Sequence, residues 1–251
     1  MSVEVERLGA VTILTINRPE RRNALDPATM SGIGLALTDA EFDDTVRVVV
    51  LTGAGDKAFC AGMDLKAFAE GGISPDKLPK PGLEVLVERV FPKPVIAAVN
   101  GPALAGGFEI MLACDLVVAA EHAMFGIPEV KRGLVAAGGG TRLPRRIPLA
   151  LALEFGLTGE PVDAARAQAL GLVNRVVPAA RVRAEAIALA EAIAANGPLA
   201  IAATKELMWA EAGGLSLAEV QARTAPVFAS DDAREGAIAF AERRAPHWRN
   251  R

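Results

Sequence analysis

The stretch Asn100-Gly-Pro-Ala-Leu-Ala-Gly-Gly-Phe-Glu-Ile-Met-Leu-Ala-Cys-Asp115 combines glycines, a turn and one carboxylate within an otherwise apolar segment. The β-branched run at residues 94–99 predicts a strand that leads into a turn at residues 100–102. The small residues that follow open a helix expected from about Gly106 to Ala113. Glycines at a helix start leave backbone N–H groups uncovered, and such N–H groups attract anions.

Glu109 is the one carboxylate in this predicted helix. It follows Gly106 by three residues and therefore lies on the same face. Its neighbours Phe108 and Ile110 are apolar, and a buried carboxylate is costly unless it is paired or functional. We therefore hypothesise an anion hole with a carboxylate beside it. Because two glycines also occur in ordinary tight turns and a single glutamate on solvated helix faces, this stretch alone leaves both interpretations open.

The composition limits the classes of function. Apolar residues make up 51% of the 251 positions, which predicts a large core and argues against disorder. The formal net charge is −3 with acids and bases interspersed, which argues against nucleic-acid binding. Asp115 interrupts the apolar run at residues 110–120, and the N-terminus lacks a basic, apolar leader. We therefore expect a cytoplasmic protein without a membrane span.

Few residues are available for metal or nucleophilic sites. The chain has two histidines, His122 and His247, which weakens any Ser-His-Asp, Cys-His or histidine-rich metal site. Cys60 and Cys114 match no metal-ligand spacing and are expected to be small core residues.

Strand and helix patterns alternate along the first 178 residues. Strands are expected at 3–7 and 11–17 as a hairpin, then at 46–52 and 115–120. Helices are expected from Asp26-Pro27 to Phe42, over 83–91, and from the glycine run 138–141. Such strand–helix units predict an α/β class with parallel pairing. The Ala-rich remainder predicts four helices, at 179–195, 199–212, 217–228 and 231–243, that pack on the core or on other subunits.

Two further segments have the composition of loops. Residues 53–66 form a glycine-punctuated loop that either connects a strand to a helix or presents backbone amides to a ligand. Its glycine spacing does not fit a P-loop. Residues 71–82 are rich in Gly and Pro and predict a mobile surface loop.

Several segments in a fixed order resemble the crotonase, or enoyl-CoA hydratase/isomerase, superfamily. They are Asn17-Arg-Pro-Glu-Arg-Arg-Asn-Ala-Leu25, Ala58-Phe-Cys-Ala-Gly-Met-Asp-Leu65, Lys93-Pro-Val-Ile-Ala-Ala-Val-Asn-Gly101, the opening stretch, Phe125-Gly-Ile-Pro-Glu129 and Asp231-Asp-Ala-Arg-Glu-Gly236. The resemblance spans nearly the whole chain. It implies a spiral of ββα units over residues 1–195 that holds the CoA thioester site, and a helical region over 196–251 that mediates trimer contacts, with trimers often pairing into hexamers.

The resemblance also implies the residues of the site. Members of the superfamily bind acyl-CoA thioesters and stabilise an enolate oxygen with two backbone N–H groups, which fall here on Met63 and Gly106. The two glutamates of its hydratases correspond to Glu109 and Glu129. The pattern further suggests CoA contacts from the following residues: Arg22, Ala24, Ala61, Asp64, Leu65, Lys66 and, reaching into a neighbouring subunit, Phe240 and Arg243. One departure is Ala136-Ala137, where many hydratases carry Pro-Gly.

These residues predict an enoyl-CoA hydratase that requires no metal and no redox cofactor. Glu109 is expected to orient and deprotonate water, and Glu129 to deliver the α proton. An enoyl-CoA isomerase or acyl-CoA hydrolase of the same fold is the alternative, followed by a non-catalytic acyl-CoA-binding protein. The 71–82 loop is expected to line or cover the acyl pocket.

Some remaining residues are expected to have structural roles. The tryptophans at positions 209 and 248 predict core or interface positions. A basic cluster is expected to form a solvated face, and it consists of Lys131, Arg132, Arg142, Arg145 and Arg146.

Overall fold

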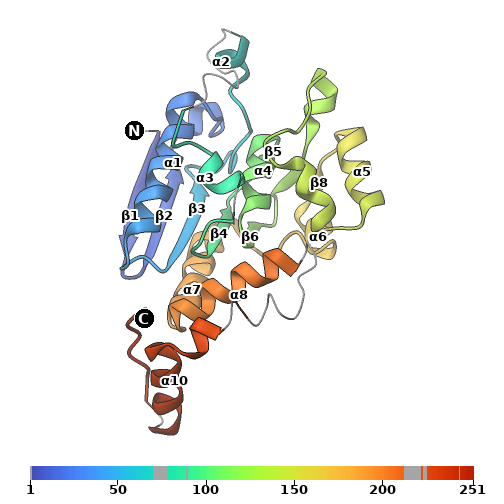
Figure 1. Ribbon diagram of the computed structural model, residues 1–251. Coiled ribbons are helices and arrows are strands. Elements are labelled where there is room, and N and C mark those ends of the chain that lie inside the picture. The colour runs from blue at the N-terminus through green and yellow to red at the C-terminus, as the bar shows by residue number, and fades with distance from the viewer. Residues whose placement is uncertain (1, 70–78, 89, 212–221, 223–224, 243) are drawn as a thin grey trace.

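The computed structural model describes most of the chain (Figure 1). The described residues are 2–69, 79–88, 90–211, 222, 225–242 and 244–251.

A six-stranded sheet runs through the molecule in the order β1-β2-β3-β4-β6-β9. The first two strands pair antiparallel as the predicted hairpin, and the others are parallel. Its strands are β1 (Val3–Leu8), β2 (Val11–Ile16), β3 (Val48–Gly53), β4 (Val95–Val99), β6 (Leu116–Ala120) and β9 (Arg175–Val177). Strands β3 and β4 are buried along their whole length, as expected for parallel strands covered on both faces.

Three short strands form a second sheet. It contains β5 (Ala103–Leu104), β7 (Met124–Gly126) and β8 (Val162–Asp163), in that order. Because β5 follows β4 and β7 follows β6, two successive turns of the chain each contribute one strand to each sheet before a helix. This arrangement agrees with the predicted ββα spiral.

Helices cover the sheets (Figure 1). Their bounds are α1 (Pro27–Phe42), α2 (Leu65–Ala69), α3 (Glu84–Val87), α4 (Gly106–Ala113), α5 (Leu149–Thr158), α6 (Ala164–Ala169), α7 (Val182–Ala194), α8 (Pro198–Glu211) and α10 (Asp231–Glu242). Helix α1 begins as predicted, with Pro27 in its first turn and the Asp26 carboxylate accepting the Thr29 N–H at 2.8 Å. Helix α7 packs on β3, β4 and β6.

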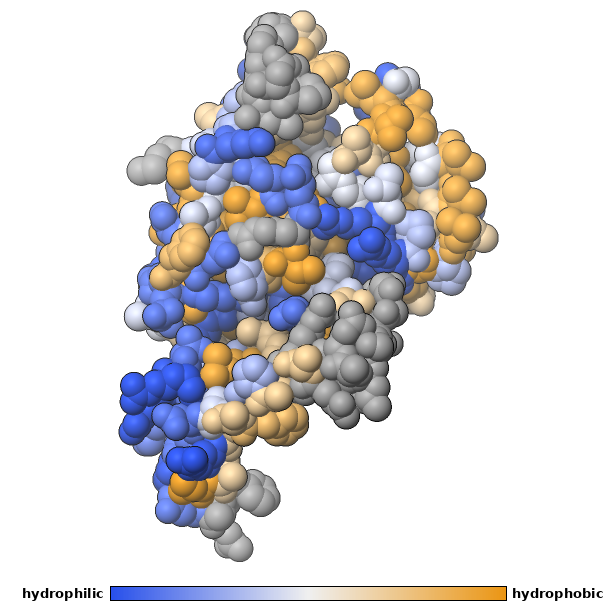
Figure 2. All heavy atoms as spheres, viewed as in Figure 1, coloured by the Kyte–Doolittle hydropathy of each residue, from blue (hydrophilic) through white to orange (hydrophobic). Residues whose placement is uncertain are grey.

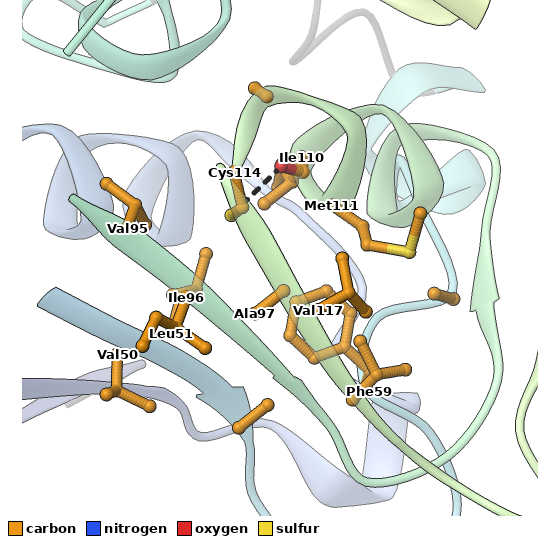
Figure 3. Packing of buried hydrophobic residues seen from close by; sticks show 14 of the residues in the cluster. Val50, Leu51, Phe59, Val95, Ile96, Ala97, Ile110, Met111, Cys114 and Val117 are labelled. Carbon is orange, nitrogen blue, oxygen red and sulfur yellow. Dashed lines mark hydrogen bonds between the residues drawn. The ribbon is translucent and has the colours of Figure 1, made fainter. Parts of the chain in front are cut away.

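Part of the core lies between the six-stranded sheet and helix α4. Ile110 and Met111 are buried, and Figure 3 shows them pointing from α4 toward the strands that carry Ala97 and Val117. The Cys114 thiol donates to the Ile110 carbonyl at 3.3 Å (Figure 3). The opening stretch of the sequence therefore forms a helix with the predicted bounds, seated on the sheet.

Two predicted helices differ from the structure. The glycine run at 138–141 leads into a 3₁₀ helix, η4 (Gly140–Arg145), because Pro144 cannot donate the hydrogen bond that an α-helix requires there. The helix expected over 83–91 is the single turn α3. The helix expected over 217–228 lies largely outside the described residues, although residues 225–228 are helical.

A polar cluster attaches helix α8 to the end of the sheet. Asp115 precedes β6 and forms a 2.6 Å ion pair with Lys205 of α8, while Trp209 of the same helix donates to Asp115 at 2.8 Å. Arg146 lies with its guanidinium 5.0 Å from the centre of the Trp209 ring and donates to the Leu112 carbonyl at 2.9 Å. The expectation that Arg146 belongs to a solvated basic face was therefore wrong. Its guanidinium group donates hydrogen bonds to backbone carbonyls at the C-terminal end of helix α4.

The helices were also compared with the length of a membrane span. Within the described ranges, no single helix is long and apolar enough to cross a membrane, and the one helix pair that passes by length and composition, at 179–194 and 198–210, is bent by 109°.

Candidate active site

Two segments far apart in the sequence run side by side at the edge of α4. The Ala61 N–H donates to the Arg22 carbonyl at 3.0 Å, the Leu25 N–H to Gly62 at 2.8 Å, and the Asp64 N–H to Leu25 at 2.9 Å. The structure therefore brings together residues 22–25 and 61–64, which carry half of the predicted CoA contacts.

Asn23 stabilises the junction between residues 22–25 and 61–64. Its side chain is fully buried and donates to the carbonyls of Ala54 and Ala58 at 3.0 and 2.8 Å, while its oxygen accepts the Arg18 N–H at 2.9 Å. Its φ of 55° is left-handed, a conformation that asparagine tolerates better than most residues.

The N–H of Met63 points away from Leu25. These two residues form a parallel bridge in which Leu25 bonds to the neighbours of Met63, so the polar groups of Met63 face the opposite side. A methyl group built on Gly106 would lie 3.7 Å from the Met63 nitrogen, and one on Gly62 would lie 3.0 Å from the Gly106 nitrogen. The two N–H groups that the sequence singled out are therefore neighbours. Within the described part of the chain, neither donates to a backbone carbonyl.

Backbone strain occurs where helix α4 starts. Ala105 precedes the helix with φ 51° and ψ −128°, a conformation that costs a non-glycine residue about 1–3 kcal/mol. The close approach of α4 to the Cys60 loop requires Gly107, because a methyl group there would lie 2.1 Å from the Cys60 carbonyl oxygen. Close packing on both sides of the first turn thus fixes the Gly106 N–H beside Met63.

Glu109 lies one turn further into α4 and is 7% exposed. Its Oε1 accepts the Gly140 N–H at 2.8 Å. Burial raises the pKa of the Glu109 carboxyl above its ordinary 4.5; the nearby charge of Glu129 adds to this, while the N–H groups of Gly140 and Gly138 oppose it. The predicted carboxylate is therefore buried and held by the glycine run that follows it in sequence.

Glu129 reaches the same site from the 3₁₀ helix η3 (Pro128–Arg132). Burial raises the pKa of its carboxyl as well, opposed by its own backbone N–H and by the charge of Arg132. Its Oε2 is buried, and no other described residue hydrogen-bonds to it. The charge of Glu129 acts on Glu109, so the two carboxyls lie close enough for Glu129 to favour the protonated form of Glu109.

A cavity of about 370 Å³ opens beside Glu129. Glu129 and Gly140 form part of its wall, together with Ala136 of the Ala136-Ala137 pair. The remaining lining residues come from η3, η4, the loop between them and α5, and all but Thr141 are apolar or glycine.

The predicted CoA-binding residues differ in their surroundings. Arg22 and Lys66 are exposed, Leu65 is 46% exposed, and Ala24 and Ala61 are partly buried. Asp64 is engaged within the chain, because Arg18 contacts both Asp64 and Asp26, at 3.2 and 3.1 Å. The Phe240 side chain and the whole of Arg243 lie outside the described residues.

Both cysteines are unpaired and buried, as predicted. Burial raises the pKa of each thiol to about 12, which keeps them protonated and unreactive.

Several residues that support the site were not predicted from the sequence. Arg18 and Asn23 lie within the quoted segment Asn17–Leu25 but were given no role. Gly138 and Gly140 were interpreted only as a helix start, although they touch Glu109. The glycine run itself was the available signal, because closely spaced glycines often allow another group to approach the backbone.

Similar proteins show the family of this chain. The family model described as enoyl-CoA hydratase/isomerase matches residues 6–251. This chain belongs to the enoyl-CoA hydratase/isomerase family. An enoyl-CoA hydratase of Mycobacterium tuberculosis is 43% identical over 98% of this chain and 96% of its own length. A carnitinyl-CoA dehydratase of Salmonella typhi is 42% identical over 100% of this chain and 99% of its own length.

Solved structures of the family share the fold. The crystal structure of an enoyl-CoA hydratase from M. tuberculosis matches with a TM-score of 0.94 and 50% identity, covering 100% of this chain and 99% of that one. A carnitinyl-CoA hydratase from Mycobacterium avium matches with a TM-score of 0.79 and 44% identity over 100% and 99% of the two chains. The predicted α/β crotonase-like fold is thus confirmed. The family contains hydro-lyases, and the chain is an enzyme of this family.

Proposed function

We propose that this enzyme adds water across the double bond of a 2-enoyl-CoA thioester to give a 3-hydroxyacyl-CoA. The observation that carries the proposal is the pair of carboxyls, in which the charge of Glu129 acts on Glu109, together with the neighbouring N–H groups of Met63 and Gly106. Hydration requires one group that takes a proton from water and one that gives a proton to carbon. A buried carboxyl pair with raised pKa values suits both tasks.

The two N–H groups provide the electrostatic part of the reaction. Attack of water at Cβ moves negative charge onto the thioester oxygen. Donors already fixed in position stabilise that charge, and the loss of one such donor typically costs about 10²–10³-fold in rate. The Met63 side chain is less important here than its backbone N–H.

Glu109 orients and deprotonates the attacking water, and Glu129 delivers a proton to Cα. The hydrogen bond from Gly140 to Oε1 of Glu109 favours the ionised carboxylate that a base needs. Glu129 has no such bond to Oε2 from the described residues, which favours the protonated form of a general acid.

The remaining parts of the account concern CoA and assembly. Arg22, Ala24, Ala61, Leu65 and Lys66 surround the junction where the CoA moiety would lie, whereas Asp64 contributes mainly by holding Arg18. Residues 196–251 form a trimerisation region in this proposal, with Phe240 and Arg243 contacting the CoA of a neighbouring subunit in a cytoplasmic trimer or hexamer.

Dehydration of carnitinyl-CoA is the second candidate, since relatives at 39–42% identity carry that name. It is a hydro-lyase reaction on an acyl group with a quaternary ammonium end. Proteins commonly recognise such cations with aromatic rings. The described lining of the cavity beside Glu129 contains no aromatic residue, which favours an apolar acyl group.

The test is a substrate panel. We expect hydration of 2-enoyl-CoA thioesters, little isomerisation of 3-enoyl-CoA and no hydrolysis of saturated acyl-CoA. Exchange of the α proton with solvent deuterium separates an enzyme from a protein that only binds acyl-CoA. Faster turnover of 3-enoyl-CoA, saturated acyl-CoA or carnitinyl-CoA than of every 2-enoyl-CoA would overturn the proposal.

A further inference from the structure

The cavity beside Glu129 is large, and most of its lining is apolar. Helix α5 contributes Ala152, Leu153, Gly156 and Leu157 to its wall. An engineered protein cavity of about 150 Å³ holds a benzene molecule. The cavity here, at about 370 Å³, has more than twice that room.

The direction of the acyl chain follows from the order of groups in the site. In the proposed reaction the thioester oxygen lies at the Met63 and Gly106 N–H groups, and Cα and Cβ lie at the two carboxyls. Everything beyond Cβ must continue past the carboxyls. Because Glu129 forms part of the cavity wall, the cavity begins next to the position that Cβ would occupy.

Large apolar side chains surround the cavity mouth. Val135 and Leu157 are 75% and 73% exposed, and Leu153 is 47% exposed. Figure 2 shows apolar residues gathered over α5 at the right of the view. All three residues also line the cavity, so an acyl group lying in it would cover part of their exposed surface.

We infer that this cavity receives the part of the acyl group beyond Cβ, and that the preferred substrates are 2-enoyl-CoA thioesters with a large apolar group there, a chain of about eight or more carbons or one ending in a ring. This inference rests on the proposed function for the placement of Cβ. A four-carbon enoyl group leaves the cavity unfilled. Each additional methylene buried contributes about 0.8 kcal/mol, which corresponds to about fourfold in binding.

Gly156 is a lining residue at which a larger side chain would reduce the volume of the cavity. It lies one helical turn from Ala152, so both small residues occupy one face of α5. A methyl group built on Gly156 would find only the Ile127 side chain within 4 Å, at 3.8 Å. The Cβ of a larger residue therefore meets no clash, and the rest of its side chain would occupy space in the cavity that Gly156 lines. Replacing a glycine inside a helix also raises helix propensity.

The experiment compares kcat/KM for crotonyl-CoA, 2-decenoyl-CoA and cinnamoyl-CoA in the wild type, Gly156→Leu and Ala150→Leu. The wild type is expected to prefer the two larger substrates by on the order of 100-fold, which is the effect of burying about three methylenes completely. Gly156→Leu is expected to lower the decenoyl-to-crotonyl ratio by on the order of 50-fold, because a leucine side chain displaces several methylenes. Ala150→Leu is the matched control, because Ala150 is an exposed residue of α5 outside the cavity lining, and its ratio should equal that of the wild type.

Binding of saturated thioesters separates this inference from the proposed function. Decanoyl-CoA is expected to bind more tightly than butyryl-CoA, and Gly156→Leu to remove most of that difference, even if no enoyl thioester is hydrated. A wild type that prefers crotonyl-CoA would overturn the inference. A Gly156→Leu variant with unchanged kcat/KM ratios and an unchanged binding difference would also overturn it. If such a variant changed only the oligomeric state, the cavity would instead be a contact between copies of the chain.

Discussion

The position of the Glu109 carboxylate can be tested by one added methyl group on the neighbouring loop. A methyl group built on Gly138 would lie 2.7 Å from Oε2 of Glu109, against an ordinary contact of at least 3.4 Å, so Gly138→Ala should displace the carboxylate by roughly 0.7 Å. The φ of Gly138 lies outside the left-handed region, so alanine fits the backbone. Because a misplacement of about 1 Å can cost about 10²-fold in rate, we expect kcat for 2-enoyl-CoA hydration to fall about 30-fold.

The loss of kcat in Gly138→Ala should depend entirely on Glu109. Measured in a Glu109→Gln background, Gly138→Ala should change kcat by less than about threefold, because the group that it displaces no longer acts as a base. In the single variant, the acid limb of the kcat/KM profile should move to higher pH, because a carboxylate pushed from the Gly140 N–H loses a bond that lowers its pKa. Urea unfolding should show no loss of stability. Equal losses in both backgrounds would refute the reasoning.

Three further predictions concern stability. Lys205→Met leaves Asp115 without its cation and should lower the free energy of unfolding by about 3–5 kcal/mol in urea; a loss below about 1 kcal/mol would contradict a structural role for the pair. Asn23→Ala removes three hydrogen bonds of a fully buried side chain and should cost about 2–4 kcal/mol in thermal or urea unfolding, whereas a neutral result would show that the junction does not depend on it. Because burial raises the folded-state pKa of Glu129 above 4.5, its ionisation costs stability as pH rises. Glu129→Gln should therefore have its unfolding midpoint at a higher urea concentration than the wild type at pH 8, and this difference should disappear below pH 4.5. An equal difference between the two midpoints at both pH values would contradict the raised pKa of Glu129.

Much of the fold could be predicted where the sequence signal is local. The hairpin, helix α1 with its Asp26 cap, and helix α4 follow from alternation, capping and an apolar run, and each lies close to its expected bounds. Strands β5 and β8 have two residues each, too short for any periodicity to reveal. Their pairing depends on the tertiary structure alone.

The same distinction applies to the candidate site. Glu109 was conspicuous because a carboxylate inside an apolar helix has no local explanation. Its contact with Gly140, 31 residues later, depends on a loop that folds back, and the pairing of Asp115 with Lys205 spans 90 residues. No local pattern specifies such contacts. The prediction that the 71–82 loop lines the acyl pocket stays a prediction: residues 70–78 lie outside the described part, and Gly82 packs against Gly34 of α1.

The shared role of the two glutamates is tested most directly by kcat for 2-enoyl-CoA hydration in Glu109→Gln and Glu129→Gln. Glutamine keeps the size of each side chain but can neither take nor give the proton, so each variant should lose about 10²–10⁴-fold while still binding the thioester. Turnover near that of the wild type in both variants would contradict the account.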